Sequence, residues 1–167
     1  METIFYISAA VAVAATIMVI AGVNAVHALL YLIVSLLAVA LVFFTLGAPF
    51  AAALEVIIYA GAIMVLFVFV MMMLNLGPAA AQQERRWLQP GMWVGPAIMA
   101  CMLLAELVAL LAHGGAALLG GDEVGAKLVG IALYGPYLLG VELASMLLLA
   151  GLVGAYHLGR RAQDAEG

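Results

Sequence analysis

The sequence predicts an all-α integral membrane protein with five transmembrane helices, its N-terminus outside and its C-terminus in the cytoplasm. Apolar residues make up 69% of the 167 residues, while only 5 Lys or Arg and 9 Asp or Glu are present. A soluble domain would carry about 25% charged residues, and one of this length could not bury so much apolar surface. Residues 3–54 carry no formal charge, and this is enough chain for two bilayer crossings of about 20 residues each.

Five apolar segments have the length of a transmembrane helix. They cover residues 4–22, 25–46, 50–76, 92–112 and 136–158. Asn24, between the first two, is a residue type favoured at a helix N-cap. The Gly47-Ala48-Pro49 stretch is typical of a turn, and Gly77-Pro78 is the pattern with which helices commonly end. Local turn and capping residues therefore predict where the first three spans begin and end.

Two polar segments separate the later helices. Residues 77–90 include Gln, Glu and two Arg residues and predict a cytoplasmic linker, whereas the Gly-rich residues 113–127 predict an external loop. Gly135-Pro136 then divides the last apolar stretch, because proline suits the first turn of a helix. A short interfacial piece, residues 126–134, is expected before the fifth span. The whole chain, residues 1–167, is predicted to be a single membrane domain.

The few cations give the predicted orientation. Arg85 and Arg86 follow the third helix, and Arg160 and Arg161 follow the fifth. These two places lie on the same side of a five-helix chain, and the positive-inside rule puts that side in the cytoplasm. Lys127 alone falls on the outer side. The N-terminus is therefore expected outside and the C-terminus inside.

Composition and motifs exclude several functions. The net charge of −4, without a basic patch, disfavours nucleic-acid binding. Cys101 has no second cysteine to pair with, and we expect it to be a small buried apolar residue. The three histidines lack the spacing of a metal site, and no phosphate-binding loop, dinucleotide fingerprint or CxxC pair is present. No metal, nucleotide or redox cofactor is therefore assigned to this chain.

Three carboxylates fall inside predicted spans, where polar side chains are costly. Glu55 lies near the start of the third helix, Glu106 about six residues from the outer end of the fourth, and Glu142 about seven residues into the fifth. Each is either an interfacial carboxylate that reaches water or a neighbouring helix, or a protonatable member of a proton relay. The sequence leaves both interpretations open.

The third predicted helix has the composition of a deformable element. Glu55 and Tyr59 are four positions apart and are expected to share a face. The following Ala60-Gly61-Ala62 permits close helix approach and a local kink or π-bulge, a feature common at functional sites. Ordinary packing against lipid and neighbouring helices is the alternative interpretation of this segment.

Several stretches of the chain resemble one membrane-protein family. The run EVIIYAGAIMVLFVFV is the most specific of them, and GPYLLGVELASMLLLAGL supports it independently. The matching stretches lie at Asn24–Leu76, Gln83–Pro90, Trp93–Ile98 and Gly135–Arg160. They resemble subunit J of respiratory NADH:quinone oxidoreductase, or complex I, whose mitochondrial counterpart is the sixth mitochondrially encoded NADH dehydrogenase subunit.

The resemblance implies a non-redox subunit of a proton-translocating enzyme in the bacterial inner membrane. NADH, FMN, iron–sulfur clusters and quinone would all be bound by partner subunits, and this chain would hold no cofactor. Its expected partners are the lipid bilayer and other complex I subunits, especially the membrane subunits A, H, K and N. A purely structural assembly subunit of the same complex and a small independent transporter remain as alternatives.

The resemblance also implies site residues. In the family the third helix can carry a π-bulge whose straightening opens a hydrated path, and by position the corresponding segments are Tyr59–Gly61 and Met64–Phe67. With the carboxylates above, the candidate proton-path or gating residues are Glu55, Tyr59, Gly61, Met64, Val65, Phe67 and Glu142. Glu106 receives no role from the resemblance.

Overall fold

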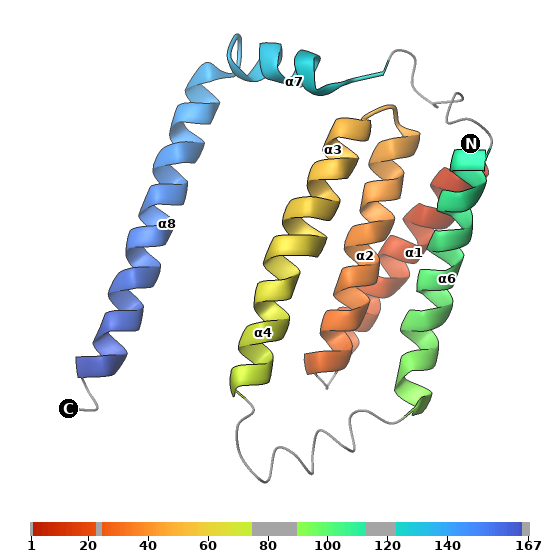
Figure 1. Ribbon diagram of the computed structural model, residues 1–167, viewed down its shortest axis with the longest axis horizontal. Helices are drawn as coiled ribbons and strands as arrows, with labels where there is room; N and C mark the ends of the chain where they lie inside the picture. Colours follow the sequence, from red (N-terminus) through yellow and green to blue (C-terminus); the bar gives the residue numbers. More distant parts are fainter. Residues whose placement is uncertain (1, 23–24, 75–89, 113–122, 165–167) are drawn as a thin grey trace. The chain divides into compact units, whose positions relative to one another are not determined.

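A computed structural model of the chain describes residues 2–22, 25–74, 90–112 and 123–164, and all regular structure within them is helical (Figure 1). Five helices in the described residues are long and apolar enough to cross a membrane. The predictions of an all-α chain and of five candidate spans are confirmed. Most of the predicted linker 77–90 and of the predicted loop 113–127 lies outside the described residues.

The first unit of the structure, which ends at residue 124, contains four of these spans. Its helices are α1 (Glu2–Ala21), α2 (Ala25–Thr45), α3 (Pro49–Leu54), η1 (Glu55–Ile63), α4 (Met64–Leu74) and α6 (Pro90–Ala112). The third span is one continuous helix in which α3, η1 and α4 follow without a break (Figure 1). Its middle section, η1, is a π-helix.

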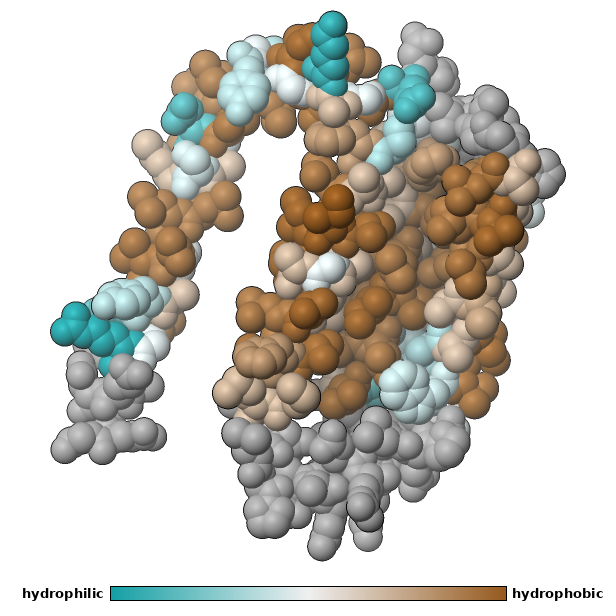
Figure 2. Space-filling view, in the orientation of Figure 1, coloured by the Kyte–Doolittle hydropathy of each residue, from teal (hydrophilic) through white to brown (hydrophobic). Residues whose placement is uncertain are grey.

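Helix α2 is the centre of this unit, because it packs against α1, against all three sections of the third span and against α6. The buried cluster consists of Val11, Ala15, Tyr31, Val34, Ala38, Leu41 and Leu103. Ala15 and Ala38 are completely buried, and such small side chains let membrane helices approach closely. The outward surface of the helices is largely apolar (Figure 2), as expected for a surface covered by lipid or by other membrane proteins.

Polar side chains add a second link between α1 and α2. The hydroxyls of Thr16 and Ser35 lie 2.9 Å apart. Each also lies within hydrogen-bond distance of the carbonyl oxygen of Ala12, at 2.8 Å from Thr16 and 3.1 Å from Ser35. Hydrogen bonds between helices in a membrane contribute about 0.6–2 kcal/mol, so this shared acceptor reinforces the packing of the first hairpin.

The turn between α2 and α3 depends on Gly47, whose φ of 85° lies in the left-handed region that glycine adopts without strain. The amide of Ala48 donates to the carbonyl of Phe43 at 3.0 Å, which closes the turn before Pro49 starts the next helix. The amide of Val124 donates to the carbonyl of Gly47 at 2.8 Å. The described segment after α6 therefore returns to this turn.

The second unit contains α7 (Ala126–Leu133) and α8 (Leu138–Asp164). A turn over residues 134–137 joins them, and the amide of Tyr137 donates to the carbonyl of Ala132 at 3.2 Å. A side chain at Gly135 would come within 2.8 Å of the carbonyl oxygen of Ile131. Glycine is therefore required at this position of the turn.

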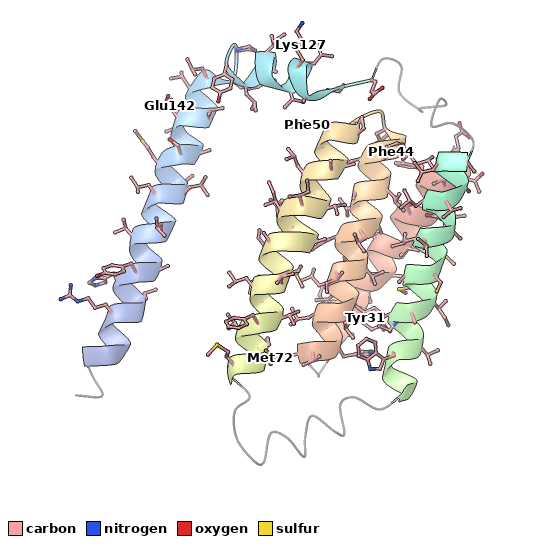
Figure 3. All side chains as sticks on the ribbon, viewed as in Figure 1. Tyr31, Phe44, Phe50, Met72, Lys127 and Glu142 are labelled. Carbon is pink, nitrogen blue, oxygen red and sulfur yellow. The ribbon has the colours of Figure 1, made fainter. Side chains whose placement is uncertain are left out.

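Helix α6 approaches α2 at Gly95. A Cβ atom at Gly95 would overlap the hydroxyl of Tyr31, which lies on the side of α2 that faces α6 (Figure 3). The Tyr31 ring also meets the ring of His27 edge-on, with 4.8 Å between centroids. Further along α6, Cys101 is exposed, so the expectation that it is buried is wrong: it lies on a face of α6 that no described helix covers.

This approach gives a test of the α2–α6 packing. Replacing Gly95 with Ala is expected to destabilise the protein by about 1–3 kcal/mol, because the added methyl group must displace the packed Tyr31 ring. The matched control is Gly91→Ala on the same helix, where a Cβ meets nothing within 4 Å. Thermal unfolding in mild detergent measures both. Equal melting temperatures for the two variants would contradict this packing.

Candidate functional site

The π-helix η1 is the most unusual local structure in the described chain. The backbone N–H of Met64, at its end, lies within hydrogen-bond range of the carbonyls of Tyr59 and Gly61. The bond to Tyr59 spans five residues, which is the π-helical pattern, whereas an α-helix spans four. Leu54 before η1 and Met64 after it both have α-helical dihedral angles. The wide turn is therefore confined to the middle of the third span.

Gly61 fits this wide turn. A Cβ atom at Gly61 would lie 3.1 Å from the carbonyl oxygen of Val56, five positions earlier. In an ordinary α-helix alanine is more favourable than glycine by about 1 kcal/mol, so an α-helical third span would gain from a side chain here. Glycine thus lowers the cost of the π conformation relative to the α conformation.

The third span is weakly packed over most of its length, with one buried residue on each side of η1 and none within it. Ala52 is buried before η1, and Met64 is 1% exposed directly after it. No residue of η1 itself is buried, and Tyr59 is 50% exposed. Segments with few buried contacts are the ones that change conformation at low free-energy cost. The two buried residues therefore hold a section of helix that is itself weakly packed.

An apolar cavity of about 520 Å³ lies beside this section, between α2, α3, η1 and α6. Its lining includes Leu41, Phe44, Val56, Leu103 and Leu107. The described residues therefore leave space next to the start of η1, on the side that faces α6.

The structure brings only some of the predicted site residues together. Glu55 and Tyr59 both lie in η1, and no hydrogen bond joins their side chains in the described part of the chain. Val65 and Phe67 are exposed on α4, beyond the end of the π-helix. The π conformation thus begins at Glu55, before the segment that the resemblance indicates, and ends before Met64.

Glu142 belongs to the second unit and is described there by itself. It is exposed near the start of α8 (Figure 3), and its backbone carbonyl accepts a hydrogen bond of 2.8 Å from the hydroxyl of Ser145. Its role in a proton path stays a prediction.

One pair of polar residues was not predicted. The hydroxyl of Ser8 on α1 donates to Oε2 of Glu106 on α6 at 2.7 Å, and both residues are buried. Of the interpretations open for Glu106, contact with a neighbouring helix is the one the structure bears out. No sequence pattern pairs two residues that lie 98 positions apart.

A metal ion in a protein is held by several His, Cys, Asp or Glu side chains that lie close together. In the residues that the structure describes, no three His, Cys, Asp or Glu side chains come together as a metal site would require. The absence of a cofactor from this chain stays an expectation.

Comparison with known proteins gives the family. A profile described as NADH-ubiquinone/plastoquinone oxidoreductase chain 6 matches residues 15–158. The chain belongs to this family. NADH-quinone oxidoreductase subunit J of Pseudomonas aeruginosa is 67% identical over 168 residues, which cover 99% of each chain. Subunit J of Escherichia coli K12 is 57% identical over 166 residues, covering 99% of this chain and 90% of that one.

The chain 6 match includes all of η1 and most of the bundle around it. It also includes Glu106 but begins after Ser8. The π-helix therefore lies well inside the part of the chain that the family profile covers, whereas the hydrogen bond between α1 and α6 extends beyond it.

The preference of Gly61 for the π conformation can be tested directly. Replacing Gly61 with Ala is expected to favour the α form of residues 55–63, because the methyl group would lie 3.1 Å from the Val56 carbonyl in the π form and alanine stabilises an α-helix relative to glycine. Amide hydrogen exchange of this segment, measured by mass spectrometry in lipid nanodiscs, should become slower. Gly151→Ala on α8, where a Cβ meets nothing within 4 Å, is the matched control. Unchanged exchange in the Gly61 variant would argue against the assignment.

Proposed function

We propose that this chain is a membrane subunit of a proton-translocating NADH:quinone oxidoreductase and that its third span couples quinone reduction to proton movement. The observation that carries the proposal is the π-helix η1, which is weakly packed and lies between buried residues in a chain of this family. π-Helical segments inside longer helices are frequent at functional sites. The relatives named above are subunits of the same type of enzyme.

In this proposal the third span has two states, one with the π-helix and one that is α-helical throughout. Loss of the extra residue in the π turn rotates one end of the helix against the other by about 100°, the angle that one residue occupies in an α-helix. Because Ala52 and Met64 are buried on either side, the rotation turns the residues between them and moves one of these two residues out of its present packing. Glu55 and Tyr59 therefore change direction.

Tyr59, with neighbouring water molecules, completes a proton path in only one of these states. Its phenol group can both donate and accept a hydrogen bond, and half of its surface is open in this chain. Glu55, four positions earlier in η1, supplies a carboxyl group that can carry the proton. The cavity of about 520 Å³ beside η1 provides space into which side chains of the third span can move.

Electron transfer is assigned to other subunits. NADH, FMN, iron–sulfur clusters and quinone are bound by partners in this proposal, and the membrane subunits A, H, K and N are the expected neighbours. The chain crosses the bacterial inner membrane five times, with the N-terminus outside and the linker 77–90 in the cytoplasm. The five apolar helices support a multi-pass arrangement, and the positions of the arginines support this orientation.

The orientation has a simple test. A reporter fused after Gly167 is expected to be active only when it is of the type that functions in the cytoplasm, because Arg160 and Arg161 retain this end inside. Paired fusions to a cytoplasmic and a periplasmic reporter measure it. Activity of the periplasmic reporter alone would reverse the proposed topology.

The coupling role is tested at Gly61. Replacing Gly61 with Val destabilises the π state through contact with the Val56 carbonyl, and each 1.4 kcal/mol of such destabilisation lowers the population of that state about tenfold. The expected result is fewer protons translocated per NADH oxidised, with electron transfer retained. Proton uptake by inverted membrane vesicles measures this ratio, and a native gel measures assembly.

Gly151→Val on α8 is the control. A Cβ at Gly151 meets nothing within 4 Å, whereas one at Gly61 lies 3.1 Å from the Val56 carbonyl oxygen. Unchanged proton translocation in an assembled Gly61 variant would overturn the coupling proposal. A Gly61 variant that alters only the amount of assembled complex would favour a purely structural subunit, and transport by the purified chain alone would favour an independent transporter.

A further inference from the structure

A buried carboxyl group lies between α1 and α6, away from the π-helix. The side chain of Glu106 is 8% exposed, and its Oε2 accepts the hydrogen bond from Ser8. Its second oxygen, Oε1, is buried and has no hydrogen-bond partner among the described residues. Buried polar atoms are almost always hydrogen-bonded, so Oε1 is positioned to take a further proton or hydrogen bond.

Glu106 occupies a place in α6 that an apolar residue would usually fill. Leu103 and Leu110, which are three positions before and four positions after it, are both buried, and residues at this spacing share one face of a helix. The carboxyl group is thus part of the packed stripe of α6 within a candidate membrane span. An ionised carboxylate is costly in such a place unless a cation compensates it.

No cation is available on the described helices of the first unit, since α1, α2, α3, η1, α4 and α6 contain no Lys or Arg. The other titratable side chains of α1 are Glu2 and Tyr6. Those of α2, the other helix packed against α6, are His27 and Tyr31. Among the residues that the structure describes, Ser8 alone is hydrogen-bonded to the carboxyl group. A proton bound at Oε1 would remove the cost of the uncompensated charge.

The pair lies close to one end of the bundle. Ser8 is six positions from Glu2 at the start of α1, and Glu106 is six positions from Ala112 at the end of α6. At 1.5 Å per residue, both are about 9 Å from the helix ends. A groove of about 720 Å³ between the two helices includes Glu2 at this end and Met102, one turn of α6 from Glu106. Neither Ser8 nor Glu106 lines this groove, so the short distance to the helix ends is what brings the buried pair near water at this end.

We propose that Glu106, held by Ser8, is a proton-binding site inside the membrane span that exchanges its proton with water at the end of the bundle where α1 begins. On uptake, a hydronium ion transfers its proton to Oε1, an O–H bond forms, and a water molecule is left. Ser8 remains hydrogen-bonded to Oε2 in both forms, and no electrons move. This site goes beyond the proposed function of the third span and does not depend on it.

Infrared difference spectroscopy of the intact, purified complex tests the site, because a protonated carboxyl group has a carbonyl stretching band that a carboxylate lacks. Spectra are compared between H₂O and D₂O for the unchanged protein, Glu106→Gln and Ser8→Ala. The expected result is one deuterium-sensitive carbonyl band that disappears in Glu106→Gln. In Ser8→Ala the band should move to higher frequency, since the carboxyl group loses a hydrogen-bond donor.

Glu2→Gln is the matched control, because it makes the same chemical change at an exposed carboxylate of the same end. It should leave the band in place. An unchanged spectrum in Glu106→Gln, or a Glu106 band insensitive to D₂O, would overturn the proposal. If Glu106→Gln does not assemble, the Ser8→Ala spectrum tests the proposal instead. A deuterium-sensitive carbonyl band at the same frequency as in the unchanged protein would then contradict the site. Proton translocation is not measured, so either result leaves the coupling proposal to its own test.

Discussion

The packing of α2 against its neighbours is the interaction on which the rest of the first unit depends. It contacts α1, each section of the third span and α6, and close approach at Ala38 and the hydroxyl of Ser35 strengthen its contact with α1. Association of helices in lipid comes from such packing and hydrogen bonding, since lipid is as apolar as the side chains. The third span and α6 are positioned through α2, with Ser8 and Glu106 adding a contact between α1 and α6.

This arrangement explains why the π conformation can persist at η1. The third span is supported by α2 along one side, while the apolar cavity toward α6 leaves the start of η1 without close packing there. A change between π and α turns would therefore disrupt few buried contacts within η1 itself. Ala52 and Met64 are the buried residues beside η1, and such a change would have to move one of them. A segment with so few buried contacts can change conformation at low free-energy cost.

The sequence predicted the features that depend on local composition. Long apolar runs indicated the spans, and Gly61 between two alanines indicated a weak point in the third. The bounds of η1, from Glu55 to Ile63, were not predictable. A helix that is apolar on every side has no repeating polar and apolar pattern that would show where its turns become wider. For the same reason the sequence could not separate a lipid-facing position such as Cys101 from a packed one such as Leu103. The Ser8–Glu106 hydrogen bond depends on the pairing of two distant helices, which local patterns do not encode.

Glu55 and Glu106 differ in their surroundings, and this difference indicates how each would handle a proton. Glu55 is half-buried at the start of a turn whose conformation is weakly fixed, so a change of helix geometry would alter what it can reach. Glu106 is packed and held by Ser8, so it would bind a proton without a movement of the backbone. The described helices of this unit contain no Lys or Arg with which either group could exchange charge. An ionised form of either group therefore has no Lys or Arg beside it in these described helices, and binding of a proton would remove its uncompensated charge.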